Sequence, residues 1–179
     1  MYHRLMSSKL DNVVNEDAVE EHIQLHGEHF GGYYKVLTPA MRPGGGKLGM
    51  NRTRVPPGRA VCPFHHHVLE DEVFYILAGT GVLRYGDQLA PLRAGDCVSC
   101  PAGTKTAHQI ANTGDEDLIY LAVGNYEPNE VCGYPDSDKV MVRSLGTVGT
   151  LDKTEYHHGE ADPPKIFALA EGLNSDLDD

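Results

Sequence analysis

Short apolar runs divided by glycine, proline and aspartate fill the middle of the chain, from residue 48 to residue 126. They are rich in Val, Ile, Leu, Tyr and Phe and recur at roughly ten-residue spacing, which is typical of antiparallel sandwiches and barrels. No helical pattern separates them that could make a parallel crossover. The pattern therefore predicts an all-β, antiparallel fold, with strands at residues 48–55, 60–67, 72–79, 81–86, 88–93, 96–101, 107–112 and 118–124.

Weaker patterns on either side divide the chain into an N-terminal arm (residues 1–47), the barrel (48–126) and a C-terminal extension (127–179). Prolines punctuate the extension, one further strand is expected at residues 139–146, and the acidic end at residues 171–179 is expected to be frayed. With 179 residues the chain has room for one sizeable core and its extensions, whereas two full domains would be cramped.

The N-terminal arm mixes helical and extended signals. Residues 15–26 predict a short helix capped by Asn15, with a sparse apolar stripe. Residues 33–37 predict a strand. Residues 39–47 include three successive glycines and predict a flexible loop, because their spacing does not match a phosphate-binding loop.

Charge limits the partners that the chain can take. Lys and Arg number 15 against 26 Asp and Glu, which gives a formal net charge of -11. Such a field repels phosphate backbones and anionic lipid headgroups, so neither nucleic acid nor a membrane is expected as a partner. The first residues lack the apolar stretch of a signal peptide, and no run reaches the roughly 18 apolar residues that span a bilayer. A cytoplasmic location is expected.

The four cysteines, Cys62, Cys97, Cys100 and Cys132, are few for a disulfide-stapled domain and compatible with reduced thiols. Cys97 and Cys100 have the spacing of half a zinc ribbon, but the chain has no second such pair. A strand would also point their thiols to opposite faces, so both are expected to be small buried residues.

Three successive histidines, His65, His66 and His67, precede an acidic cluster in the middle of the chain. Because side chains alternate faces along a strand, His65 and His67 share one face and His66 lies on the other. Glu72 follows a bend of four residues, where the returning strand can turn its carboxylate back toward the first two histidines. The spacing thus selects two histidines and one carboxylate.

His108, on a later predicted strand, is the fourth candidate because the barrel can bring it beside the first three. Three imidazoles and one carboxylate suit one first-row divalent ion such as Fe, Mn, Ni, Co or Zn. On an octahedral ion, two positions would stay open. The parity that turns Glu72 inward also places Phe74 and Ile76 inward.

Other polar residues are expected to play simpler parts. His66 is expected at the rim or in a subunit contact, and His157 and His158 are expected to be solvated, although a tail folded over the barrel could bring one of them near the metal. Lys105 is expected to be exposed, with contact to an anionic substrate as the alternative. Four candidate acids and bases stay unassigned because strand register decides whether they face inward: Glu70, Tyr75, Arg84 and Tyr85.

The spacing around the histidine run resembles the first motif of the cupin superfamily, which runs Gly, about five residues, His-x-His, three or four residues, Glu, six residues, Gly. The chain has six residues between the first glycine and histidine, so this loop is longer. The matching residues are Gly58, His65, His67, Glu72 and Gly79.

A second stretch resembles the second cupin motif, which runs Gly, five residues, Pro-x-Gly, a short spacer, His, three residues, Asn. Its spacer is four residues long here, which alters the loops of a pocket more than its ligands. The matching residues are Gly95, Pro101, Gly103, His108 and Asn112.

The resemblance implies the double-stranded β-helix of cupins, a jelly-roll barrel, with the four candidate ligands holding one divalent metal. Within the superfamily the chain is similar to small single-barrel proteins, some of them labelled sugar-phosphate isomerase-like.

An open metal position suits a bidentate oxygen ligand, so isomerase, epimerase or lyase chemistry on a small oxygen-rich metabolite is expected. An Fe(II) dioxygenase and a non-catalytic small-molecule or carbohydrate-binding cupin are the alternatives. Open sheet edges also predict a homodimer.

Overall fold

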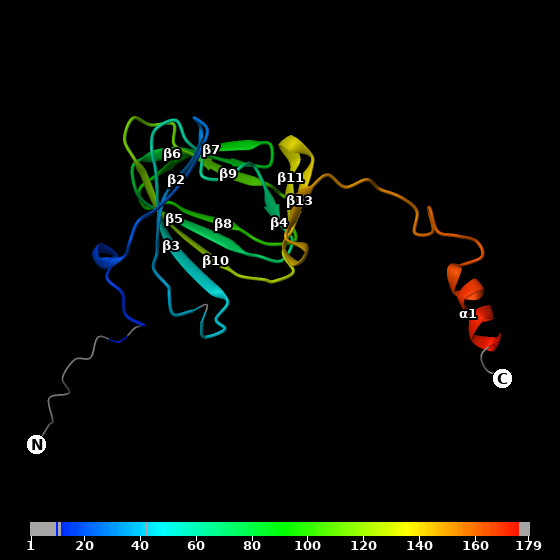
Figure 1. The fold of residues 1–179 in the computed structure, drawn as a ribbon. Coiled ribbons are helices and arrows are strands. Elements are labelled where there is room, and N and C mark those ends of the chain that lie inside the picture. Colours follow the sequence, from blue (N-terminus) through cyan, green and yellow to red (C-terminus); the bar gives the residue numbers. More distant parts are fainter. Residues whose placement is uncertain (1–9, 11, 42, 176–179) are drawn as a thin grey trace, which may run out of the picture.

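The computed structural model describes residues 10, 12–41 and 43–175, and most of its regular elements are strands (Figure 1). The strands are β1 (His22–His26), β2 (Phe30–Val36), β3 (Leu48–Val55), β4 (His66–His67), β5 (Glu72–Ala78), β6 (Thr80–Tyr85), β7 (Gln88–Arg93), β8 (Cys97–Cys100), β9 (His108–Ala111), β10 (Leu118–Asn125), β11 (Val131–Tyr134), β12 (Lys139–Val142) and β13 (Thr147–Gly149). The helices are three short 3-10 turns, Glu16–Ala18, Pro135–Ser137 and Arg143–Leu145, and the α-helix α1 (Lys165–Ser175). The expected all-β fold is confirmed.

The strands form two layers that face each other across the core (Figure 1). One layer is a six-stranded sheet in the order β1-β2-β3-β10-β5-β8. The other consists of β7-β6-β9 and β13-β12-β11-β4, which meet at an antiparallel bridge between His65 and His108. All paired strands are antiparallel. The sheets do not close into one continuous barrel, so the fold is a jelly-roll sandwich of two layers.

Strand β5 shows how the sequence sets the two faces. Phe74 and Ile76 are buried in the core, as the alternation predicts, whereas Val73, Tyr75 and Leu77 lie on the outer face and are exposed. The core lies between the layers and includes Val55, Phe74, Ile76, Leu92, Val98, Cys100, Ile110, Leu118 and Tyr120. Because Glu72 shares the parity of Phe74, its carboxylate projects between the layers.

The turn between β5 and β6 depends on Gly79. Its φ is +77°, and a Cβ there would lie 2.4 Å from the carbonyl oxygen of Asp117. Only glycine fits this left-handed backbone and close approach without strain. The final glycine of the first motif therefore has a structural reason.

The N-terminal arm differs from the helix expected over residues 15–26. Asn15 does cap a helix, accepting a hydrogen bond from the Asp17 N–H, but the helix is the single 3-10 turn Glu16–Ala18. Residues His22–His26 form β1, which pairs with β2 along its whole length. The helix prediction was wrong because pairing with a sheet satisfies the backbone of a segment whose helical stripe is sparse.

The expected strand at residues 60–67 is reduced to β4, His66–His67, with isolated bridges at Ala60 and His65. Pro63 interrupts the segment, since proline cannot donate to a strand ladder. The expected strand over residues 139–146 shortens to β12. Strands β11 and β13 were not predicted, because their segments show no clear alternation of apolar and polar residues.

The C-terminal extension ends in α1, where part of the segment expected to be frayed is helical; residues 176–179 lie outside the described part. The run of helix-forming Ala and Leu residues after Pro164 explains the helix. All described side chains from residue 144 to residue 171 are exposed, and α1 stands apart from the barrel (Figure 1).

The flanks nevertheless take part in the sheets. β2 pairs with β3, and β11 pairs with β4 at the histidine run. Within the described part of the chain, no helix has the length and apolar character needed to traverse a bilayer.

Candidate metal centre

The fold brings His65, His67, Glu72 and His108 together between the two layers. His65 and His67 come from the β4 segment, Glu72 begins β5 and His108 begins β9. One ligand atom from each side chain lies within 4.8 Å of the others. Four residues far apart in sequence thus form one cluster that could hold a metal ion.

Glu72 lies at the centre of this cluster. Its Oε2 is 2.9 Å from Nε2 of His108, 3.1 Å from Nε2 of His67 and 3.8 Å from Nε2 of His65. Burial opposes the charged carboxylate, but the hydrogen bond with His108 and the nearby imidazole of His67 outweigh it and hold the pKa of Glu72 well below its usual range. Glu72 is therefore an anion facing three imidazole nitrogens.

The tautomer of His65 follows from its backbone contact. Its Nδ1 lies 2.8 Å from the carbonyl oxygen of Pro63, and since a carbonyl only accepts, Nδ1 carries the proton. The lone pair of Nε2 then faces the cluster. Burial lowers the pKa of His65 to about 4, aided by the neighbouring His108. This imidazole stays neutral, as a metal ligand must be.

Nε2 of His67 is buried without a partner in hydrogen-bond geometry, although Glu72 Oε2 is near. Burial opposes protonation of this ring, but the neighbouring Cys132 and the carboxylate of Glu72 raise the pKa of His67 to about 10. A buried nitrogen aimed at a carboxylate and two further imidazoles fits a divalent cation better than it fits a closed hydrogen-bond network. The residues present therefore fit a metal.

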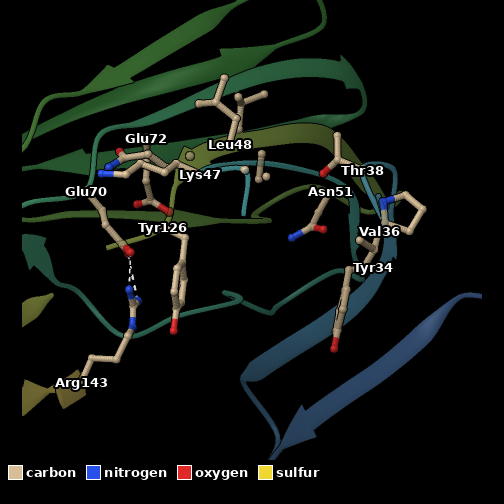
Figure 2. A pocket seen from close by; sticks show the side chains of 17 residues that line it. Tyr34, Val36, Thr38, Lys47, Leu48, Asn51, Glu70, Glu72, Tyr126 and Arg143 are labelled. Atoms are coloured by element: carbon tan, nitrogen blue, oxygen red, sulfur yellow. Dashed lines mark hydrogen bonds and ion pairs between the residues drawn. The ribbon is translucent and has the colours of Figure 1, made fainter. Parts of the chain in front are cut away.

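A cavity of about 420 Å³ adjoins the cluster, with Glu72 in its wall (Figure 2). Asn51, Thr38 and Tyr34 line its other side, on or near β2 and β3. Its size is that of a small-molecule site. The cavity is lined more by polar than by apolar groups, which suits an oxygen-rich ligand.

Both cations of this cavity are held by neighbouring acids. Lys47 Nζ is 2.6 Å from Glu127 Oε1, and the Arg143 guanidinium forms a fork with the carboxylate of Glu70 (Figure 2). Arg143 Nη1 also donates to the carbonyl oxygen of Glu127. The guanidinium therefore fixes the cavity wall.

The other histidines lie as expected from strand alternation and from their polar surroundings. His66 points away from the cluster, and its ring packs against Gly133, where a Cβ would come within 2.3 Å of it. His157 and His158 are exposed in the C-terminal extension. Lys105 is exposed too, with a left-handed φ of 59°.

The two cysteines of β8 point to opposite faces, as predicted. Cys100 is buried, but Cys97 is exposed, so the expectation that both are buried was wrong for Cys97. Tyr75 is exposed on the outer face of β5, and the Arg84 guanidinium pairs with Asp136. Asn112, from the second motif, is buried, and its amide donates to the carbonyl oxygens of Val55 and Glu116.

Sequence reasoning missed the residues behind the cluster. Glu130 and Cys132 lie in or beside β11 and form a second group with His67 whose ligand atoms lie within 4.8 Å of one another. Glu70, left unassigned from the sequence, is buried and paired with Arg143. No spacing within a segment indicates Glu70, Glu130 or Cys132, because β11 and β4 lie far apart in the sequence and pair only in the folded protein.

Comparison with known families identifies the central part of the chain. Residues 51–124 match the family model described as "Cupin domain". The central part of the chain thus matches the cupin domain. The match spans β3 to β10 and includes all four clustered residues, whereas β1, β2 and β11 to β13 lie outside it.

Solved cupin structures resemble the chain over most of its length. A protein of Acidithiobacillus ferrooxidans named as a candidate sugar phosphate isomerase is 26% identical to this chain. The two structures align with a TM-score of 0.65 over 76% of this chain and 86% of that protein. A Silicibacter pomeroyi protein named as a sugar phosphate isomerase of the cupin superfamily is 27% identical. It aligns with a TM-score of 0.64 over 79% of this chain and 94% of that protein.

A curated relative points to a different ligand. The oxalate-binding protein of Thermotoga maritima is 42% identical over 72 residues, which cover 40% of this chain and 57% of that protein. The cupin domain is thus similar both to isomerase-like proteins and to a binder of a small dicarboxylate.

Proposed function

We propose that this cupin domain is a divalent-metal-dependent enzyme that acts on a small oxygen-rich metabolite, with sugar or sugar-phosphate isomerisation or epimerisation as its chemistry. The metal ligands proposed are His65, His67, Glu72 and His108. The observation that carries the proposal is the convergence of three imidazole nitrogens on Glu72 in the wall of a polar cavity. The likeness to two isomerase-described cupins supports it.

A bound divalent ion would act as a Lewis acid and stabilise the oxyanion that develops when the carbon beside a carbonyl loses a proton. Aldose–ketose isomerisation moves one proton between neighbouring carbons and one between their oxygens, epimerisation returns the proton to the same carbon, and neither consumes an oxidant. The chain itself supplies the enclosing walls, which position the reacting end beside Glu72. Asn51 and Tyr34 supply polar groups toward the far end.

The charges of the cavity favour the neutral, polyol part of such a substrate. Since Arg143 and Lys47 are already paired, free guanidinium recognition of a dianion is not built into the wall. Neutral hydroxyl and amide groups suit the hydroxyls of a polyol, and the exposed Lys47 could exchange Glu127 for a phosphate.

A non-catalytic binder of a small dicarboxylate is the second candidate, favoured by the 42% identity to the oxalate-binding protein. Such a ligand needs only two neighbouring oxygens. It would leave the polar groups around Asn51 unused. Sugar-like substrates and oxalate therefore make different demands on the same cavity.

The test begins with the untagged full-length protein on a gel-filtration column coupled to metal detection. One equivalent of a transition metal per chain is expected. The protein should elute at the size of a dimer, because the outer face of β5 exposes apolar side chains that a second copy would cover. We propose the cytoplasm as the location of this dimer. A peak without metal, with no gain in melting temperature on adding divalent ions, would remove the central claim.

The loaded protein is then mixed with aldose and ketose phosphates, α-hydroxy acids and oxalate, while NMR follows product and melting temperature follows binding. An isomerase converts a sugar-type compound, and Asn51→Ala weakens this conversion without loss of metal. A melting shift with oxalate and no product from any compound supports the binder instead.

A further inference from the structure

The second ring nitrogen of His67 has its own buried surroundings, on strand β11. β11 pairs with β4 so that Cys132 lies opposite His67, on the same face. Cys132 Sγ is 3.3 Å from Nδ1 of His67, and the cysteine is only 2% exposed. The thiol therefore sits behind the imidazole, on the side away from Glu72.

Glu130 completes these surroundings. Its side chain is fully buried, and its two oxygens accept hydrogen bonds from the backbone N–H groups of Val68 and Leu69, at 2.8 and 2.9 Å. Those two residues directly follow His67. Glu130 Oε1 also lies 3.6 Å from Nδ1 of His67. The carboxylate thus fixes the chain at the point where it leaves the ligand.

Glu70 is the other carboxylate near this nitrogen, 3.8 Å away. Its oxygens already accept hydrogen bonds from Arg143 and from the backbone N–H of Glu127. Cys132 Sγ is therefore the acceptor best placed for a hydrogen bond donated by the Nδ1–H of His67.

We propose that Cys132 and Glu130 are positioning residues for His67. The Nδ1–H of His67 donates to Cys132 Sγ, which leaves the lone pair of Nε2 aimed at the metal, and Glu130 locks the backbone that carries the ring. This inference rests on the proposed metal centre. It extends that centre beyond the cupin match, since Cys132 and Glu130 belong to the C-terminal extension.

The same three groups could be read as ligands of a second ion bridged by the His67 ring. Two features favour positioning. Both oxygens of Glu130 are committed to backbone N–H groups, and Nδ1 can bind a second ion only if His67 gives up the proton that fixes its tautomer. A second ion is therefore an outcome that the experiment must detect.

The experiment titrates Co(II) into the chelator-treated full-length protein and follows the visible absorption of the bound ion. Cys132→Ala is expected to weaken Co(II) binding roughly 10- to 100-fold, as loss of a hydrogen-bond partner behind a metal ligand does. Cys132→Ser keeps a hydrogen-bonding group and should recover most of that loss. Glu130→Gln, which offers one backbone N–H an amide nitrogen instead of an oxygen, should weaken binding to a similar extent.

Cys97→Ala is the control, since it removes a thiol of the barrel that lies exposed on β8, away from the face that carries Cys100. It should bind Co(II) as the unmodified protein does. Nitrogen NMR of the Zn(II)-loaded protein supplies an independent signature, because His67 should carry its proton on Nδ1. In Cys132→Ala that proton should exchange faster with water.

Equal Co(II) affinity in Cys132→Ala and the unmodified protein would overturn the inference and leave the metal centre standing. A sulfur-to-cobalt charge-transfer band, or two equivalents of Co(II) per chain, would overturn it in favour of ligation by Cys132. If the unmodified protein binds no Co(II), the proposed function itself fails. Should Cys132→Ala not fold, Cys132→Ser and Glu130→Gln carry the comparison.

Discussion

Two carboxylates of the same acidic cluster, Glu70 and Glu72, meet opposite fates between the layers. Glu70 is paired with the guanidinium of Arg143, a cation at every accessible pH, and also accepts the N–H of Glu127. Glu72 is surrounded by imidazoles alone. The first carboxylate has a permanent cation in the chain, whereas the second relies on a proton held by His67, which a bound metal ion can displace.

This difference separates a structural site from a ligand site. A permanent ion pair closes one wall of the cavity, while Glu72 keeps a partly open side chain with 26% exposure beside the cavity. The chain thus places an anion without a permanent cation where a ligand can reach it. A cation that binds there would replace the proton at His67.

Replacing Glu72 should have the largest effect. Glu72→Gln keeps the shape of the side chain but removes its charge, so we expect the affinity for Zn(II) or Co(II) to fall more than about 100-fold, beyond the range for residues that only support a ligand. Calorimetric titration of the chelator-treated protein measures it. The metal-dependent gain in melting temperature should vanish with it.

His157→Ala combined with His158→Ala is the control for the Glu72 variant. These adjacent, exposed histidines could take up metal adventitiously, so their removal should leave the high-affinity equivalent intact. Retention of tight binding by Glu72→Gln would show that the carboxylate is not a ligand.

The second prediction concerns pH and His67 in the metal-free protein. Because folding raises the pKa of His67 from 6.5 to about 10, its protonated ring stabilises the fold fully below pH 6.5. That contribution is lost as pH rises toward 10, at no more than about 1.4 kcal/mol per pH unit. His67→Gln should remove this part of the slope, as measured by urea unfolding between pH 7 and 9.

Saturating Zn(II) should flatten the same slope, because the metal displaces the proton that His67 would otherwise lose. The Glu70–Arg143 pair supplies no such dependence, since arginine stays charged throughout. A slope that is identical in His67→Gln and the unmodified protein would contradict the account of this ring.

The barrel and the four clustered residues could be predicted from sequence because their signals are local. Alternation along residues 72–76 places Glu72, Phe74 and Ile76 on one face, and motif spacing links the histidine run to His108. The strands predicted at residues 48–55 and 88–93 coincide with β3 and β7. The alternation needs only the period of a strand, whereas the motif spacing that includes His108 rests on the resemblance to cupins.

The rest depends on pairing between distant segments. Cys132 reaches His67 across 65 positions, through a strand of four residues with no clear alternation. β1 was mistaken for a helix because its backbone is satisfied by β2, a partner that the segment's own pattern does not reveal. Glu70 stayed unassigned because its partner Arg143, 73 positions away, meets it only in the fold.

Replacing Glu70 should give the smallest and most selective effect. Glu70→Gln leaves the Arg143 guanidinium without its anion, and because Arg143 is partly exposed we expect a loss of about 1–3 kcal/mol in the free energy of unfolding. Urea unfolding of the metal-free protein measures it. The affinity for metal should change by less than a factor of ten, because Glu70 lies behind His67, 3.8 Å from its Nδ1, with its oxygens held by Arg143 and by the N–H of Glu127.

The double variant Glu70→Gln with Arg143→Gln tests whether the loss belongs to the pair. Two amides can still hydrogen-bond, and no charge is then left half-buried, so the double variant should be more stable than the sum of the single losses predicts. If Glu70→Gln abolishes metal binding as Glu72→Gln does, the two carboxylates act as one site. Retained metal affinity with reduced stability would instead show that Glu70 stabilises the fold and Glu72 binds the metal, because only Glu70 has a permanent cation within reach.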